Sequence, residues 1–336
     1  MARGVLADRV SREGTSAERV DRRRERWPAR HRDPSRIRGA VIRGAARANP
    51  PDRGEMILSV DGRHVHLTDL HALLFPRRGL TKGDLLRYYA ELAPVLLPHL
   101  HDRPMVARMP ASRPPWLVLC SIEHAAGNVV DFPVVQDLLS LLWIVNLGCI
   151  GLYQWYAPCD DVDRPDAVHL DLEPGPGASF AQVRAAALAV HRALDEIGLA
   201  SYAKTSGASG IQVSAPIERG PLGREVRDFA RAIARGLASE RPELLTAECR
   251  PAHRPADRVL VDYNQNAWGR TLASVYSVRP GAEATVSAPV GWDEIETEIE
   301  VTDFRLDNVP GRVRRRGDLW QPLLAACGRA RLPASP

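Results

Sequence analysis

The sequence lacks any long apolar run. Although 45% of its 336 residues are hydrophobic, the longest apolar stretches, such as 138–150, are too short or too interrupted to cross a bilayer. The N-terminus is rich in arginine and has no apolar core of the kind that a secretory signal needs. We therefore expect a cytoplasmic protein with no membrane partner, long enough to bury one large core or two smaller ones.

The sequence also lacks paired cysteines. None of its five cysteines stands in a C-x-x-C spacing, which argues against both a zinc site and a disulfide framework. We predict reduced and mostly buried thiols at Cys120, Cys149, Cys159, Cys249 and Cys327.

Positive charge is concentrated at one end of the chain. Residues 1–54 hold fifteen arginines against seven acidic residues, so the remaining chain carries a net charge of −4 although the total is +4. The globular part is therefore not a uniformly basic body, and contacts to nucleic acid must come from local patches or from the tail. We predict a disordered tail at 1–54, either a DNA-tethering arm or a solvated extension or mispredicted start, followed by a domain at 55–330.

The first part of that domain predicts a hairpin and two helices. Apolar alternation in 56–60 and 65–67 around Asp61-Gly62 is typical of a hairpin. Thr81 to Asp84 has the form of a capping box that opens a helix, and Pro94 and Pro98 are expected to bound it. The apolar run 135–147 has helical spacing and predicts a buried helix.

The middle of the chain predicts alternating strands and helices. Residues 167–172 alternate as a strand, and a capping box at Ser179 and Gln182 opens a helix that Gly198 ends. Further strands are expected at 201–203, 211–215 and 259–261, with a helix over 224–238. This alternation indicates an α/β or α+β class, and no internal repeat is present.

Three carboxylates could carry chemistry. Asp171 and Glu173 lie two residues apart on a predicted strand, so both leave the same face, and Asp262 ends another apolar strand. Carboxylate oxygens suit hard divalent cations, and two Mg²⁺ or Mn²⁺ ions commonly serve phosphoryl transfer. The pattern alone also fits an ordinary solvated or salt-bridged sheet edge.

A turn of small residues at 204–210 joins two of the predicted strands. Its sequence, KTSGASG, offers hydroxyls and backbone amides that could cradle phosphate oxygens. An ordinary glycine-rich connection would have the same composition. It is not a Walker loop, because no G-x-x-x-x-G-K-[ST] is present.

Six motifs occur in register between about residues 56 and 327. They are LTKGDL with YY, then PHL and DRP (80–104), LDLEPG (170–175), KTSG with Gly210, VDY with QN (261–266), YSVR (276–279) and the segment 314–320. Taken together, these motifs resemble the polymerase domain of bacterial ligase D, a primase-polymerase of prokaryotic end joining. No ligase or nuclease domain accompanies them, so a stand-alone form is expected.

The resemblance implies a fold and a set of roles. The fold is a compact primase-polymerase with a central mixed or antiparallel sheet flanked by helices. Two Mn²⁺ or Mg²⁺ ions are implied at Asp171, Glu173 and Asp262. The implied nucleotide contacts are Ser206, Ser209, Gln212, Arg270 and Arg279, and Lys82 is implied to contact a recessed 5′-phosphate of DNA.

The resemblance also implies partners. These are DNA ends or a gapped duplex, a nucleoside triphosphate, and a separate DNA ligase and end-binding protein, in a cytoplasmic, nucleoid-associated setting.

The departures from the family pattern cluster at this expected site. Glu173 stands where the family has a second aspartate, and one methylene displaces a carboxylate by about an ångström, which can cost ~100-fold in rate. Ser209 and Gln212 replace a lysine and a histidine, and Tyr153 replaces another histidine. Ala72 stands where a basic residue helps to bind 5′-phosphate. The segment 105–116 is short and lacks the family's phenylalanine pair and lysine.

Three hypotheses follow. The first is an active, weakened nucleotidyltransferase that acts at DNA ends or gaps. The second is a catalytically degenerate protein that binds DNA ends or gaps with the same fold. The third is another metal-dependent phosphotransferase or hydrolase that uses the same carboxylates. Metal-dependent nucleotide binding distinguishes the first two, and polymer extension against hydrolysis distinguishes the first from the third.

Overall fold

The computed structural model describes residues 54–124, 127–325 and 329–332. The predicted tail at 1–54 lies outside these ranges except for Gly54, and so does Cys327. Among the described residues, no helix is both long and apolar enough to cross a membrane. The four cysteines in these ranges are free, as predicted, although Cys120 alone among them is fully buried.

A six-stranded sheet forms the centre of the described domain. Its strand order is β11-β12-β8-β10-β9-β14, with β11 parallel to β12 and every other pair antiparallel. The predicted α/β class with a mixed central sheet is therefore confirmed. The strands are β8 (Ala167–Pro174), β9 (Tyr202–Thr205), β10 (Ile211–Pro216), β11 (Leu245–Thr246), β12 (Val259–Asp262) and β14 (Pro289–Val290).

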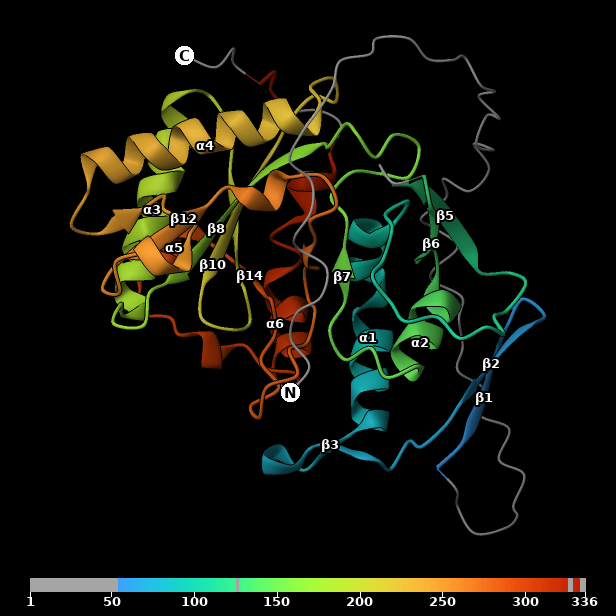
Figure 1. The fold of residues 1–336 in the computed structure, drawn as a ribbon. Coiled ribbons are helices and arrows are strands. Elements are labelled where there is room, and N and C mark those ends of the chain that lie inside the picture. The colour runs from blue at the N-terminus through green and yellow to red at the C-terminus, as the bar shows by residue number, and fades with distance from the viewer. Residues whose placement is uncertain (1–53, 125–126, 326–328, 333–336) are drawn as a thin grey trace. The chain divides into compact units, whose positions relative to one another are not determined.

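Helices α3 (Phe180–Glu196) and α4 (Gly223–Glu240) cover one face of this sheet (Figure 1). The sequence dictates this arrangement, because the alternate residues Val168, Leu170 and Leu172 of β8 are buried with the apolar stripes of both helices. The capping box that opens α3 is present, and Gly198 ends the helix in a left-handed conformation at φ 75°.

Helices α1 (Lys82–Leu100) and α2 (Leu138–Asn146) pack against each other. The predicted capping box at Thr81 and Asp84 is confirmed. The prediction that Pro94 and Pro98 bound this helix is wrong, because both prolines lie inside α1. Each proline removes one backbone donor, but the leucines on either side of them are buried in the core, and that packing stabilises the continued helix.

Short strand pairs complete the domain. The predicted hairpin is confirmed as β1 (Met56–Val60) with β2 (Arg63–Leu67). The other pairs are β3 (Leu73–Phe75) with β4 (Leu80–Thr81), β5 (Val118–Glu123) with β6 (Val129–Val134), and β7 (Tyr153–Gln154) with β13 (Leu272–Ala273). The remaining described helices are α5 (Trp292–Glu296) and α6 (Val309–Arg316), with the 3-10 helices η2 (Pro76–Arg78), η3 (Pro251–His253), η4 (Asn264–Asn266), η5 (Val301–Asp303) and η6 (Gln321–Leu324).

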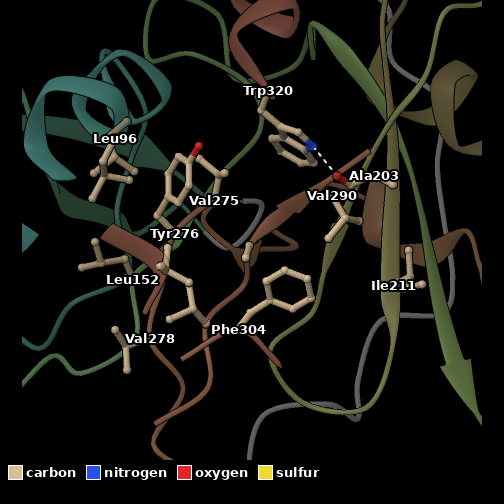
Figure 2. Packing of buried hydrophobic residues seen from close by; sticks show 14 of the residues in the cluster. Leu96, Leu152, Ala203, Ile211, Val275, Tyr276, Val278, Val290, Phe304 and Trp320 are labelled. Atoms are coloured by element: carbon tan, nitrogen blue, oxygen red, sulfur yellow. Dashed lines mark hydrogen bonds between the residues drawn. The ribbon is translucent and has the colours of Figure 1, made fainter. Parts of the chain in front are cut away.

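The last part of the described chain packs against the sheet near β9. The Trp320 indole donates a hydrogen bond of 2.9 Å to the backbone carbonyl of Ala203, and its ring lies among buried side chains that include Val275 and Val290 (Figure 2). The centre of the Trp320 ring also lies 5.5 Å from the ammonium nitrogen of Lys204. The tryptophan therefore lies against β9 on the side of the sheet to which Lys204 projects, and that side carries the candidate site.

Candidate functional site

Four polar side chains form a row across the central sheet. In the antiparallel register, Lys204 of β9 lies opposite Gln212 of β10, Gln212 lies opposite Asp171 of β8, and Asp171 lies opposite Asp262 of β12. Directly opposed residues project from the same face of a sheet. We call Lys204, Gln212, Asp171 and Asp262 the polar row. It brings together two of the three predicted carboxylates with one predicted nucleotide contact.

Asp171 is the most buried carboxylate of this row, with 5% of its surface exposed. Burial and, after it, the neighbouring charge of Glu173 together raise the pKa of Asp171 to about 7, against the opposing effect of a hydrogen bond from Gln212. Its Oδ1 atom is buried and has no hydrogen-bond partner among the residues that the structure describes. A buried carboxylate oxygen without a donor is costly, so this atom is a natural ligand for a cation or a donor from a substrate.

Asp262 and Glu173 are held differently. Asp262 accepts hydrogen bonds from the backbone amide of Asn264 at 2.8 Å and from the side chain of Gln265 at 3.0 Å. Glu173 is exposed, and its Oε2 lies 3.9 Å from Nη1 of Arg254. Partial burial of its carboxylate, followed by the charge of Asp262, raises the pKa of Glu173 against the opposing charge of Arg254. The glutamate is thus turned towards an arginine at the edge of the row.

The three carboxylates fit a divalent cation in part. Within the described ranges, no three His, Cys, Asp or Glu residues are placed as a ready metal cage. The unpartnered Oδ1 of Asp171, with the Asp262 carboxylate directly across the strand pair, nevertheless matches the oxygen ligands that Mg²⁺ and Mn²⁺ prefer. Glu173 could join such a site after its carboxylate leaves Arg254.

Lys204 is a member of the row to which the sequence analysis assigned no role. It is completely buried, and its ammonium group donates hydrogen bonds to the Gln212 side chain, to the Ala273 carbonyl at 3.0 Å and to the Ser287 hydroxyl at 2.6 Å. Burial lowers the pKa of Lys204 to about 7, against the opposing attraction of Asp171. The sequence feature that could have indicated a role for Lys204 is its position as the first residue of the KTSG motif.

Hydrogen bonds within the small-residue loop after β9 hold its conformation. The Ser206 hydroxyl accepts hydrogen bonds from the backbone amides of Ala208 at 3.1 Å and Gly210 at 3.0 Å. Gly210 lies so close to β8 that an added Cβ would stand 2.2 Å from the carbonyl oxygen of Leu172. Ser209, the predicted substitute for a lysine, is exposed at the tip of the loop. The loop is therefore preformed beside the strand that carries Asp171.

Arg279 lies beside this loop. Its guanidinium stands 5.3 Å from the centre of the Tyr153 ring, a cation–π contact, and its side chain packs against Gly207. Tyr153, the residue that replaces a histidine, thus supports Arg279. Arg270 is exposed and lines a pocket together with Trp155, at a separate place along the sheet face.

Lys82 begins α1, where its backbone amide donates a hydrogen bond of 2.8 Å to the carbonyl of Ala72. The two positions implicated in 5′-phosphate binding are therefore neighbours in space, one basic and one alanine. Only 8% of the Lys82 surface is exposed, and burial lowers its pKa while Asp69 opposes that effect. Lys82 and Ala72 therefore meet at the first turn of α1, and neither is a member of the polar row.

Comparison with known proteins identifies the family. The family model described as "LigD, primase-polymerase domain" matches residues 81–320, which contain the whole polar row. The chain belongs to this family. The described fold also matches the polymerase domain from Mycobacterium tuberculosis ligase D in complex with DNA, with a TM-score of 0.72, 28% sequence identity, and coverage of 78% of this chain and 98% of that chain.

Curated relatives in the LigD family agree with this assignment. The multifunctional non-homologous end joining DNA repair protein LigD of Mycobacterium tuberculosis is 30% identical over 288 residues, which cover 79% of this chain and 38% of that protein. LigD of Mycolicibacterium smegmatis is 30% identical over 276 residues, which cover 77% of this chain and 36% of that protein. The chain thus matches little more than a third of the length of these LigD proteins.

Proposed function

We propose that this protein is a template-directed nucleotidyltransferase that fills gaps at DNA ends during end joining, with a weakened active site. The observation that carries the proposal is the buried, unpartnered Oδ1 of Asp171 opposite Asp262, inside a domain of the LigD primase-polymerase family. A DNA-bound relative of the same fold supports DNA as the substrate.

In this proposal each residue has a role that follows from the chemistry of its side chain. Asp171, Asp262 and Glu173 would hold two Mn²⁺ or Mg²⁺ ions, which supply Lewis-acid stabilisation of the phosphates and of the attacking 3′-oxygen. Arg279 would bind triphosphate oxygens, a role that its position beside the preformed loop supports. Ser206 and Ser209 in that loop, Gln212 in the polar row, and Arg270 in its separate pocket would make further contacts to the nucleotide. Lys82 would contact a 5′-phosphate of DNA.

A non-catalytic DNA-end or gap-binding protein is the second candidate. It is favoured by the engagement of Glu173 with Arg254 and by the internal hydrogen bonds of the polar row, because both leave the side chains partnered without a nucleotide. A separate ligase and an end-binding protein would act with either form.

Primer extension on a gapped, 5′-phosphorylated duplex tests the first candidate against the second. The assay contains Mn²⁺ and each nucleotide in turn, and an Asp171→Ala variant is the matched control. Extension by the wild type that disappears in the variant supports the polymerase. Binding of the gapped duplex without extension, in both proteins, supports the second candidate, whereas extension that survives in the variant contradicts the metal assignment.

A further inference from the structure

An aromatic cluster lies in the described domain outside the polar row. The Trp155 ring meets the rings of Phe132 and Trp268 edge to face, with centroids 5.6 and 5.1 Å apart, and Trp268 meets His124 at 5.2 Å. We call Phe132, Trp155, Trp268 and His124 the aromatic cluster. Trp155 is buried at its centre, whereas Trp268 is 44% exposed.

Trp268 is held in place although it is exposed. Its indole nitrogen donates a hydrogen bond of 3.0 Å to the Asp163 carboxylate, so the ring has a fixed orientation. A tryptophan that served the core would bury most of its large apolar surface. A ring that is fixed by its polar edge and left open to solvent is instead suited to stacking with a flat partner.

The aromatic cluster borders the candidate active site. Trp155 and Trp268 line one pocket with Gln265, His169 and Arg270. Gln265 donates one of the hydrogen bonds that Asp262 accepts. On β8, His169 lies two residues before Asp171 and projects from the same face. A ligand in this pocket would therefore lie next to the carboxylates of the polar row.

The pocket also offers polar recognition. The Nε2 atom of His169 is buried and has no hydrogen-bond partner within the described part of the chain, while Nδ1 shares a hydrogen bond of 2.8 Å with the Ser214 hydroxyl. Only 3% of the His169 surface is exposed. Arg270 is exposed at the pocket and adds a positive charge for a phosphate. Aromatic faces, one unpartnered ring nitrogen and one arginine together match the chemistry of a nucleotide unit.

We propose that the aromatic cluster is a nucleobase-binding site in which Trp268 stacks on a base next to the polar row. The base belongs either to an unpaired position of a DNA strand or to a free nucleoside triphosphate. The inference rests on the proposed function, since it assumes that DNA and nucleotides are the substrates.

The experiment compares binding of two gapped duplexes that differ at one position. One carries a normal base in the template opposite the gap, and the other carries an abasic site there. We expect wild-type protein to bind the first duplex about tenfold more tightly, the effect typical of one stacked base. Trp268→Ala should remove this preference, and Trp268→Phe should keep most of it. Leu147→Ala changes another exposed apolar residue, at the end of α2, and should leave the preference unchanged.

A second arm distinguishes the source of the base. ATP and inorganic tripolyphosphate are titrated separately, and Trp268→Ala should weaken binding of ATP alone if the base comes from the nucleotide. A loss of discrimination in either arm supports the stacking site and identifies its ligand. Unchanged discrimination in both arms overturns it while leaving DNA binding intact. A wild-type protein that binds neither DNA nor ATP would instead refute the proposed function itself.

Discussion

Lys204 on β9 faces Gln212 on β10 directly across the sheet, and its ammonium group donates a hydrogen bond to the Gln212 side-chain oxygen. The Gln212 amide in turn donates to Asp171. A neutral amide therefore connects a buried cation to a buried carboxylate. Lys204 is therefore the internal counter-charge of Asp171, which has measurable consequences for stability and ligand binding.

Replacing Lys204 with methionine should destabilise the protein. The change removes the donor from three buried acceptors, on Gln212, Ala273 and Ser287, and leaves Asp171 without its nearest cation. We expect a loss on the order of 3 kcal/mol in the free energy of unfolding, measured by urea denaturation. The same change in an Asp171→Asn background should cost clearly less. Equal costs in the two backgrounds would show that the two residues are not electrostatically linked.

His169 should make the stability depend on pH in mildly acidic solution. Burial lowers the pKa of His169 to about 3 in the folded protein, from an ordinary value near 6.5. Between these values the unfolded chain binds a proton that the folded protein excludes, so stability falls as the pH is lowered through this window. The maximum slope for one proton is about 1.4 kcal/mol per pH unit.

The His169→Gln variant tests this slope. Its unfolding free energy should fall less steeply between pH 6 and pH 5 than that of the wild type, whatever its absolute stability. Parallel curves for the two proteins would mean that other groups govern the acid sensitivity.

Ser209→Lys should strengthen triphosphate binding. Ser209 is exposed at the tip of the preformed loop, so a lysine there can reach solvent-side phosphate oxygens without disturbing the core. We expect a several-fold lower Kd for ATP, measured by fluorescence titration at low salt, since the added interaction is charged and screened. Ser209→Gln has similar length without the charge and should show no gain. A gain of the same size for Gln would remove charge as the explanation.

Mn²⁺ should stabilise the folded protein through Asp171. A cation that binds the folded state at 100 times its Kd adds about 2.7 kcal/mol to the unfolding free energy, which is visible as a rise of several degrees in Tm. The Asp171→Asn variant should lose this rise, because the unpartnered Oδ1 no longer carries charge. Asp257→Asn, which alters a largely exposed carboxylate, should retain it. A rise of equal size in Asp171→Asn would mean that the ion binds elsewhere.

The sequence was most informative where structure is local. The capping boxes at Thr81 and Ser179 and the alternation of β8 depend on neighbouring residues, and all of them are confirmed. The same alternation correctly placed Asp171 on the face away from the apolar core. Pro94 and Pro98 were misjudged because the packing that sustains α1 comes from residues far along the chain.

The site was less predictable than the fold. Lysine is rarely buried, so the KTSG motif that begins with Lys204 does not indicate that its side chain is completely buried within the polar row. The pairing of Glu173 with Arg254 joins residues some eighty positions apart and depends on β12 lying beside β8. The contacts of Trp268 are equally non-local, since its partners Trp155 and His124 lie more than a hundred positions earlier in the sequence.

Two adjacent residues in the loop after β9 differ sharply in their tolerance to substitution. At Gly210, any side chain would collide with the Leu172 backbone, and both strands would have to separate to admit it. At Ser209, one residue earlier, the side chain points into solvent. In a library of variants selected for folding, position 210 would therefore retain glycine while position 209 accepted nearly every amino acid. Natural or engineered substitutions at position 209 can therefore change the charge beside the candidate site without changing the structure of the sheet.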